Sequence, residues 1–157
     1  METKAESNTK TLTITRTFNA PRQLVWEAWA NVKHIQQWWA PKGFTNPVCN
    51  WDFKAGGKIY IEMKAPDGVL YPMEGEFLEI VKPERIIFTS PAIDKKGEHL
   101  FEVHNTVTFT EEGNKTKVEL HIVFSSIKPE GLQSIGGAEM GWNTSFDKLV
   151  TLLNNLK

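Results

Sequence analysis

The 157-residue sequence contains a single cysteine, Cys49, and no long apolar run. One cysteine excludes an internal disulfide framework and a cysteine-rich metal site, and it is typical of proteins from a reducing compartment. No apolar segment approaches the roughly 20 residues that a membrane-spanning helix needs. The polar first ten residues also lack the apolar stretch of a signal peptide. We therefore expect a cytoplasmic protein without a membrane span.

The sequence also lacks an excess of charge of either sign. It has 18 lysines and arginines against 19 aspartates and glutamates, which gives a formal net charge of −1. Surfaces that bind nucleic acid usually carry clustered basic residues, and this sequence has no such cluster. Its 4 histidines do not have the spacing of a zinc motif. We expect no nucleic-acid partner, no metal and no cofactor.

Length and composition predict one globular domain. A chain of this length buries roughly 70% of the surface that it exposes when unfolded, which is enough for a hydrophobic core. Hydrophobic residues make up 40% of the sequence, and no internal repeat or linker-like segment interrupts it. We expect residues 1–10 to form a disordered arm and residues 11–157 to form a single domain.

Alternation of apolar and polar residues predicts an antiparallel sheet. In residues 11–18 apolar side chains alternate with polar ones, and this period of two is typical of a half-buried strand. Two short helices are predicted after it, beginning near Pro21 and Asn31. Further strands are predicted over residues 48–53, 58–64, 70–81, 85–89, 99–110 and 115–124.

The C-terminal segment has the pattern of a long amphipathic helix. Its apolar residues recur at helical spacing, at Trp142, Phe146, Leu149, Val150, Leu153 and Leu156. Four glycines in residues 131–141 disfavour a continuous helix, so we expect a loop or loose first turns there. This helix is the only long element that could cover the apolar face of the sheet. The predicted fold class is α+β, with an antiparallel sheet of six or seven strands packed on the helix.

Several short motifs follow one another in an order that is fairly specific. They are Phe18-Asn-Ala-Pro21, Trp38-Trp39-Ala-Pro41, Trp51-Asp-Phe-Lys-Ala-Gly-Gly57, Pro66-Asp-Gly68, Gly75-Glu-Phe77, Pro83-Glu-Arg85 and Gly141-Trp142. In this order they resemble the SRPBCC (START-like, birch-pollen-allergen-like) superfamily, and within it the branch named for the C-terminal domain of the activator of heat shock protein 90 ATPase. The resemblance covers about residues 11–157. It implies a helix-grip fold, in which a curved sheet wraps around the C-terminal helix and leaves a cavity between them.

The resemblance leaves three functions open. Members of the superfamily include carriers of lipids and polyketide-like ligands, polyketide cyclases and chaperone activators. We expect non-enzymatic binding of a hydrophobic small molecule, aromatic, polyketide-like or lipid-like, in a monomer or weak dimer. The alternatives are a polyketide cyclase- or dehydratase-like enzyme and a chaperone-associated protein. The binding function is preferred because the sequence contains no recognisable pair of nucleophile and base.

The crowded aromatic residues are the best candidates for the cavity walls. Six tryptophans, four of them within residues 26–39, exceed what one helix-on-sheet contact usually requires. Apolar walls with a few polar points are what a small-molecule site needs. The predicted wall residues are Trp38, Trp39, Phe44, Trp51, Phe77, Phe101, Met140, Trp142 and Phe146. Asn105 is the first polar candidate, because alternation places it on the apolar face of its strand, and Tyr60 and His99 follow.

Overall fold

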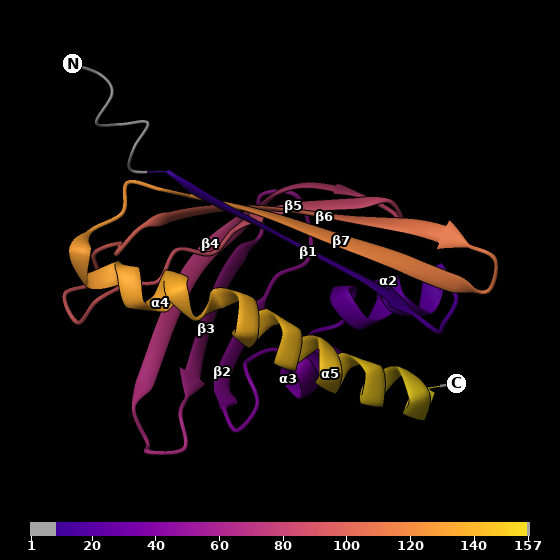
Figure 1. Cartoon of the computed structure of the whole chain (residues 1–157), viewed down its shortest axis with the longest axis horizontal. Helices are drawn as coiled ribbons and strands as arrows, with labels where there is room; N and C mark the ends of the chain where they lie inside the picture. Colours follow the sequence, from indigo (N-terminus) through magenta and orange to yellow (C-terminus); the bar gives the residue numbers. More distant parts are fainter. Residues whose placement is uncertain (1–8, 157) are drawn as a thin grey trace.

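The computed structural model describes residues 9–156, which form one seven-stranded antiparallel sheet with helices on its concave side (Figure 1). The strands are β1 (Lys10–Phe18), β2 (Thr45–Trp51), β3 (Lys58–Lys64), β4 (Leu70–Val81), β5 (Arg85–Thr89), β6 (Glu102–Glu112) and β7 (Lys115–Ser125). The helices are α2 (Arg22–Ala30), α3 (Val32–Trp38), the 3-10 turn η1 (Pro129–Gly131), α4 (Leu132–Gly136) and α5 (Ala138–Leu156). The strand order is β1-β7-β6-β5-β4-β3-β2. The predicted α+β class and helix-grip arrangement are confirmed.

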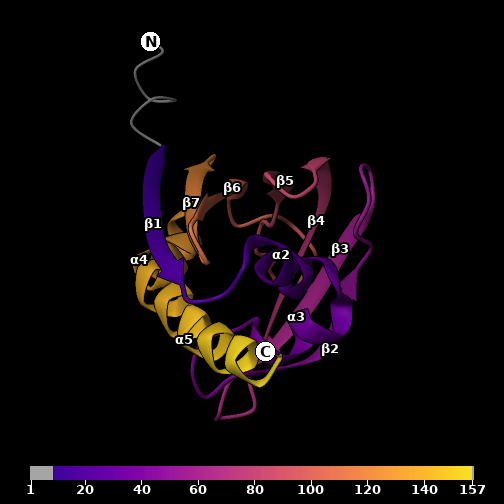
Figure 2. The same cartoon turned by 90° about the vertical axis from the view of Figure 1, so that its right-hand side faces the viewer.

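The sheet is bent into a trough, and α5 crosses its open side (Figure 2). Strand β4 turns the corner, since its first part pairs with β3 and its last part, Phe77–Val81, pairs with β5. Gly75 lies at this turn, where a Cβ atom would lie 1.9 Å from the main-chain oxygen of Thr89. Only a residue without a side chain allows the two strands to approach this closely.

Two short helices occupy one end of the trough. Pro21 precedes α2, and Asn31 caps α3 by accepting a hydrogen bond from the main-chain N–H of Lys33 at 2.9 Å. Both starts agree with the sequence, because proline is tolerated where a helix begins and asparagine is a favoured cap. The indole of Trp38 donates to the main-chain oxygen of Ala28 at 2.9 Å, which joins the two helices.

The long helix α5 packs on the sheet through its predicted apolar stripe. Phe146, Leu149 and Leu153 are buried against the core. Of the two expectations for the preceding glycine-rich segment, a loop or loose first turns, the structure shows short helical turns, since η1 and α4 occupy most of it. The break comes at Gly137, and α5 begins one residue later. The glycines therefore interrupt a helical segment without replacing it.

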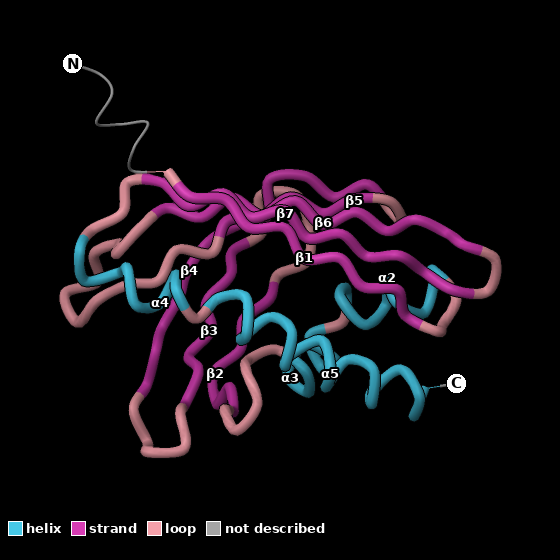
Figure 3. The backbone as a smooth tube through the Cα atoms, viewed as in Figure 1, coloured by secondary structure: helices cyan, strands magenta, loops and turns pink. Residues whose placement is uncertain are grey.

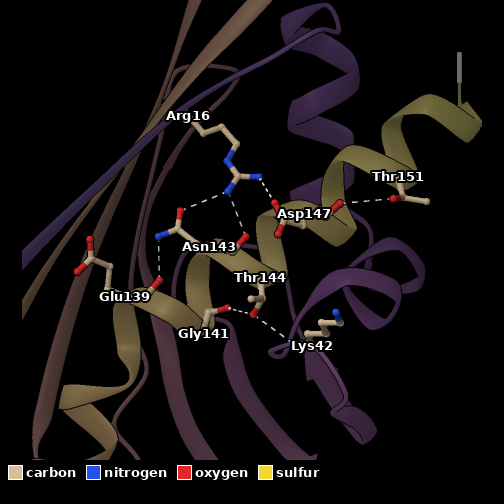
Figure 4. A network of polar contacts seen from close by, with 8 residues as sticks. All are labelled: Arg16, Lys42, Glu139, Gly141, Asn143, Thr144, Asp147 and Thr151. Atoms are coloured by element: carbon tan, nitrogen blue, oxygen red, sulfur yellow. Dashed lines mark hydrogen bonds and ion pairs between the residues drawn. The ribbon is translucent and has the colours of Figure 1, made fainter.

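Arg16 of β1 connects the edge of the sheet to the middle of α5 (Figure 4). Its guanidinium donates to the carboxylate of Asp147 at 2.7 Å and to the main-chain oxygen of Asn143 at 3.1 Å. In the same turn of α5, the hydroxyl of Thr144 accepts a hydrogen bond from the main-chain N–H of Lys42 at 3.1 Å (Figure 4). These contacts hold α5 from both sides, so its first turns have a defined place above the sheet.

The boundaries of three predicted elements need correction. The strand predicted over residues 48–53 covers Thr45–Trp51. The strand predicted over residues 99–110 starts at Glu102, and His99 lies in the segment before it. Of the predicted N-terminal arm, residues 1–8 lie outside the described residues, and Lys10 already belongs to β1.

Candidate functional site

A cavity of about 540 Å³ lies between the concave face of the sheet and the first turns of α5. The sheet contributes residues of β3, β4, β6 and β7, and the cover consists of α4, α5 and the segments after α3 and after β5. Figure 3 shows α4 and the loops beside it at the end of the trough away from α2. The cavity therefore occupies the end of the trough that the two short helices leave free.

The floor of the cavity is the inner face of β6 and β7. Val103, Asn105, Ile122 and Phe124 line it, and all four are buried. They face each other in register, Val103 opposite Phe124 and Asn105 opposite Ile122. Alternation along both strands directs these side chains to the same face. An asparagine thus lies in an otherwise apolar floor.

Asn105 is 1% exposed, and only one end of its amide is hydrogen-bonded. Its Nδ2 donates to the main-chain oxygen of Phe88 at 3.3 Å and to Oγ of Ser90 at 2.9 Å. Because a main-chain carbonyl only accepts, the nitrogen must face Phe88, and this fixes the orientation of the amide. Within residues 9–156, Oδ1 has no hydrogen-bond partner and is closed to solvent. An unpaired buried carbonyl costs about 1–3 kcal/mol, so Oδ1 is an acceptor that lacks a donor.

Four of the predicted wall residues and the polar candidate Asn105 line the cavity. The four wall residues are Trp39, Phe44, Phe101 and Trp142. Trp39 and Trp142 form one wall, with their rings edge to face and their centroids 5.0 Å apart. The structure brings these residues together from the segment between α3 and β2, from β6 and the residue before it, and from α5.

Four other predicted wall residues are buried and lie outside the cavity lining. They are Trp38, Trp51, Phe77 and Phe146. Trp51 and Phe77 pack edge to face with their centroids 4.9 Å apart, and the Trp51 indole donates to the main-chain oxygen of Trp29 at 2.7 Å. Phe146 packs on Phe18 at 5.5 Å. These rings fill the core, because aromatic crowding marks buried volume without showing which part of it stays hollow.

Met140 and Tyr60, two further predicted cavity residues, also lie outside the cavity lining. Met140 is 74% exposed, since it lies on the outer side of α5. Tyr60 belongs to the outer face of β3, and its hydroxyl donates to Glu62 at 2.7 Å. This hydrogen bond raises the pKa of the Tyr60 phenol above its ordinary value.

His99 likewise lies outside the cavity. Its Nδ1 and Nε2 lie 2.6 Å from a carboxylate oxygen of Glu102 and 2.8 Å from one of Glu74. The hydrogen bonds with Glu102 and Glu74 raise the pKa of the His99 imidazole. The histidine therefore connects the segment before β6 to β4 on the outside of the molecule.

Other cavity residues were missed, and they differ in the signal that could have identified them. Val103, Ile122 and Phe124 lie on faces that alternation marks as covered, so pattern reasoning could have included them. Ser90 follows β5 in an irregular segment, and Ser145 lies between stripe residues of α5. Nothing in the local sequence of these two serines indicates that they line a cavity.

The titratable residues of the cavity lie toward its mouth. Tyr71 and Lys95 are exposed, and Asp94 is half-buried. The carboxylate of Asp94 accepts the main-chain N–H groups of Glu98 and Lys96 at 2.9 and 2.8 Å, and these bonds lower its pKa. The floor itself presents no ionisable side chain among its four residues, so the deep part of the cavity is electrically neutral.

Metal and thiol chemistry receive no support from the described residues. Among residues 9–156, no group of three or more histidine, cysteine, aspartate or glutamate side chains could hold a metal ion. Cys49 is half-buried, and burial raises the pKa of its thiol to about 11. The thiol is therefore protonated and poorly nucleophilic near neutral pH. In the same described part of the chain, no helix is both long enough and apolar enough to cross a bilayer.

Comparison with known proteins identifies the family. The family described as "Activator of Hsp90 ATPase homolog 1-like protein" matches residues 19–154, and the chain belongs to it. This assignment confirms the resemblance seen in the sequence motifs. No curated protein matches the chain. The family and its fold support a ligand-binding or related domain, without specifying a ligand.

Solved structures show the same fold. A protein from Nitrosomonas europaea has 25% sequence identity and a TM-score of 0.78, over 92% of this chain and 94% of its own. A protein from Mycobacterium smegmatis has 26% identity and a TM-score of 0.77, over 94% of this chain and 92% of its own. The AHSA1 protein from Silicibacter pomeroyi, at 21% identity, has a TM-score of 0.78 over 94% of this chain and 100% of its own.

Proposed function

We propose that the protein binds a hydrophobic small molecule, aromatic, polyketide-like or lipid-like, in the cavity between the sheet and α5. The observation that carries this proposal is the cavity of about 540 Å³, with its apolar walls and the single amide of Asn105 in its floor. Its volume lies within the range of roughly 300–1,000 Å³ that small-molecule pockets occupy. A few polar groups among apolar walls supply orientation, and the walls supply the free energy.

The driving force for binding would be the burial of apolar ligand surface. Removing about 200 Å² of apolar surface from water contributes roughly 5 kcal/mol before the costs of ordering the ligand. Trp39, Trp142 and Phe101 offer ring faces and edges to such a ligand, and aromatic pairs add to the free energy of area burial. A flat or elongated apolar molecule suits walls of this kind.

Binding fits the cavity better than catalysis does. An enzyme acting on a polyketide-like substrate would need a titratable group beside the reacting atoms, usually one with a shifted pKa. The titratable lining residues Tyr71, Asp94 and Lys95 stand at the mouth, and the Asp94 carboxylate is engaged by its own loop. A chaperone-associated function has only the family name in its support, with no surface among residues 9–156 that favours it specifically.

We also propose that the protein acts in the cytoplasm. Its lone half-buried cysteine suits a reducing compartment, where disulfide bonds do not contribute to stability.

A thermal-shift panel of lipids and aromatic natural products tests the binding function. A compound that binds the folded state raises Tm, and its stabilisation grows with the logarithm of its concentration over Kd, reaching about 2.7 kcal/mol at a hundredfold excess. We expect apolar, uncharged members of the panel to raise Tm and small polar metabolites to leave it unchanged. No shift with any member at saturating concentration would contradict the proposal. Co-purification with a heat shock protein 90 homologue and stimulation of its ATPase would instead favour the chaperone alternative.

A further inference from the structure

The floor of the cavity offers a hydrogen-bond acceptor and a donor next to each other. The acceptor is Oδ1 of Asn105, which has no partner among residues 9–156. The donor is the hydroxyl of Ser90, a second lining residue, whose Oγ accepts from Asn105 Nδ2 at 2.9 Å. Since a hydroxyl that accepts one hydrogen bond keeps its own hydrogen for another, Ser90 retains a donor. In the described part of the chain, no acceptor takes it.

The same floor disfavours a charged ligand. The lining residues that carry a charge are Asp94 and Lys95, near the mouth, and the Asp94 carboxylate is already held by two main-chain N–H groups. Burying an ion against Val103, Ile122 and Phe124 would remove its water without supplying a counter-charge. The deep end of the cavity therefore suits a neutral group that both donates and accepts one hydrogen bond.

We propose that the ligand is a neutral, largely apolar molecule with a hydroxyl group, and that this hydroxyl donates to Asn105 Oδ1 and accepts from Ser90 Oγ. This inference rests on the proposed binding function and adds the chemical class of the ligand. A hydroxyl supplies the missing donor and the missing acceptor with one atom. Oδ1 is closed to solvent in this structure, so the proposal requires the amide and its neighbours to move enough to admit the hydroxyl.

Selectivity is the measurable consequence. A site built to hydrogen-bond a hydroxyl rejects an analogue that lacks it, because the buried polar groups of the site are then left unpaired. We expect a hydroxylated ligand to bind roughly ten- to a hundredfold tighter than an analogue of the same shape without the hydroxyl. An analogue that can only accept a hydrogen bond should gain little, since Asn105 Oδ1 needs a donor.

Three biphenyl probes separate these properties. 4-Hydroxybiphenyl donates and accepts, 4-methoxybiphenyl only accepts, and 4-methylbiphenyl does neither, while all three are uncharged and similar in shape. Binding is followed by tryptophan fluorescence, because Trp39 and Trp142 line the cavity. We expect 4-hydroxybiphenyl to bind much more tightly than 4-methoxybiphenyl and 4-methylbiphenyl. Equal binding of all three would overturn the hydroxyl inference and leave the binding function standing. Binding of none would count against both.

Substitutions in the cavity floor test whether Asn105 and Ser90 cause the preference for 4-hydroxybiphenyl. In Asn105→Leu, which replaces the amide by an apolar side chain of similar size, the preference for 4-hydroxybiphenyl should vanish while 4-methylbiphenyl binds at least as well as before. Ser90→Ala, at a half-buried position, should reduce the preference and serves as a second test if the first variant does not fold. Thr116→Val is the matched control, since the Thr116 hydroxyl donates to the main-chain oxygen of Ala20 at 2.8 Å in the core, outside the cavity lining. An undiminished preference in folded Asn105→Leu would overturn the inference.

Discussion

The two ends of the trough differ in how side chains fill the space under α5. At the end occupied by α2 and α3, Trp26, Trp29 and Trp38 are buried, and the centroids of Trp29 and Trp38 lie 4.8 Å apart. At the other end, the cavity of about 540 Å³ remains between the same sheet and the same helix. The two ends share the sheet and α5, so the difference must come from the side chains that each end receives.

The helix itself accounts for much of this difference. Toward the cavity it presents the small residues Ala138, Gly141 and Ser145 beside the single ring of Trp142, and Gly137 lies just before its first turn. Toward the packed end it presents Phe146, Leu149 and Leu153. A helix whose side chains are small along one stretch leaves space that the sheet opposite cannot close. The order of small and large residues along α5 therefore determines where the cavity lies.

The largest effect is expected from removing a ring at the packed end. Phe146→Ala should lower the free energy of unfolding by about 3–5 kcal/mol, because it removes a buried ring and leaves a void among Phe18, Trp29 and Trp38. Urea denaturation followed by circular dichroism measures the loss. Met140→Ala on the exposed side of the same helix is the control and should change stability by less than about 0.5 kcal/mol. Similar losses in both variants would show that the packed end is not packed as described.

Two substitutions of valine by phenylalanine on the same strand compare the cavity end of the trough with its packed end. Val103 and Val107 both face inward from β6, but only Val103 lines the cavity. Val107→Phe should destabilise the protein by about 1–3 kcal/mol, because a full core has no room for the ring. Val103→Phe should cost less than about 1 kcal/mol or even stabilise, since the ring enters the hollow. Thermal and urea unfolding of both variants decide between these outcomes, and equal destabilisation would argue against a hollow next to Val103.

Loss of the Arg16 contacts should loosen the cover of the cavity. Arg16→Met keeps an apolar stem but removes the hydrogen bonds with Asp147 and Asn143. We expect a loss of about 0.5–1.5 kcal/mol, because the ion pair is partly exposed and such pairs contribute modestly. Hydrogen exchange should quicken in the turns of α5 around Asn143 and remain slow around Leu149. Uniform quickening along α5 would contradict a local role for Arg16.

The smallest effect is a dependence of stability on pH through His99. The hydrogen bonds with Glu102 and Glu74 raise the pKa of His99 in the folded protein, so its protonated form favours folding. This contribution is complete below the unfolded pKa of about 6.5 and is lost as pH rises through the higher folded pKa. His99→Gln should therefore lower Tm relative to the parent near pH 6 and match it at pH 9. A constant difference across this range would exclude the protonated imidazole as its cause.

The fold could be predicted from the sequence to a large extent, because its determinants are periodic. Alternation in β6 and β7 and the helical stripe of α5 are local patterns, and they survive into the structure with boundary shifts of a few residues. Asn105 was found by the same reasoning, since its position in the alternation places it on the inner face. Family motifs supplied the curvature and the cavity, which no single strand encodes.

The cavity lining was harder to predict, because it depends on what remains unfilled after packing. Phe146 and Trp142 lie one helical turn apart in α5, yet only Trp142 borders the hollow. Met140 fits an apolar list but faces solvent. Ser90, just after β5, is held beside β6 by its main-chain hydrogen bond to Val103 and by the hydrogen bond that its hydroxyl accepts from Asn105. Which residues border the cavity depends on contacts between distant segments of the chain, and composition and spacing do not predict those contacts.

The most direct test of the central claim is calorimetric titration of the best compound from the panel into the parent protein and into folded Val103→Phe. The proposed cavity predicts one site in the parent protein, a negative heat-capacity change from apolar burial, and at least tenfold weaker binding in the variant. Unchanged affinity in a variant that remains folded would contradict binding in this cavity.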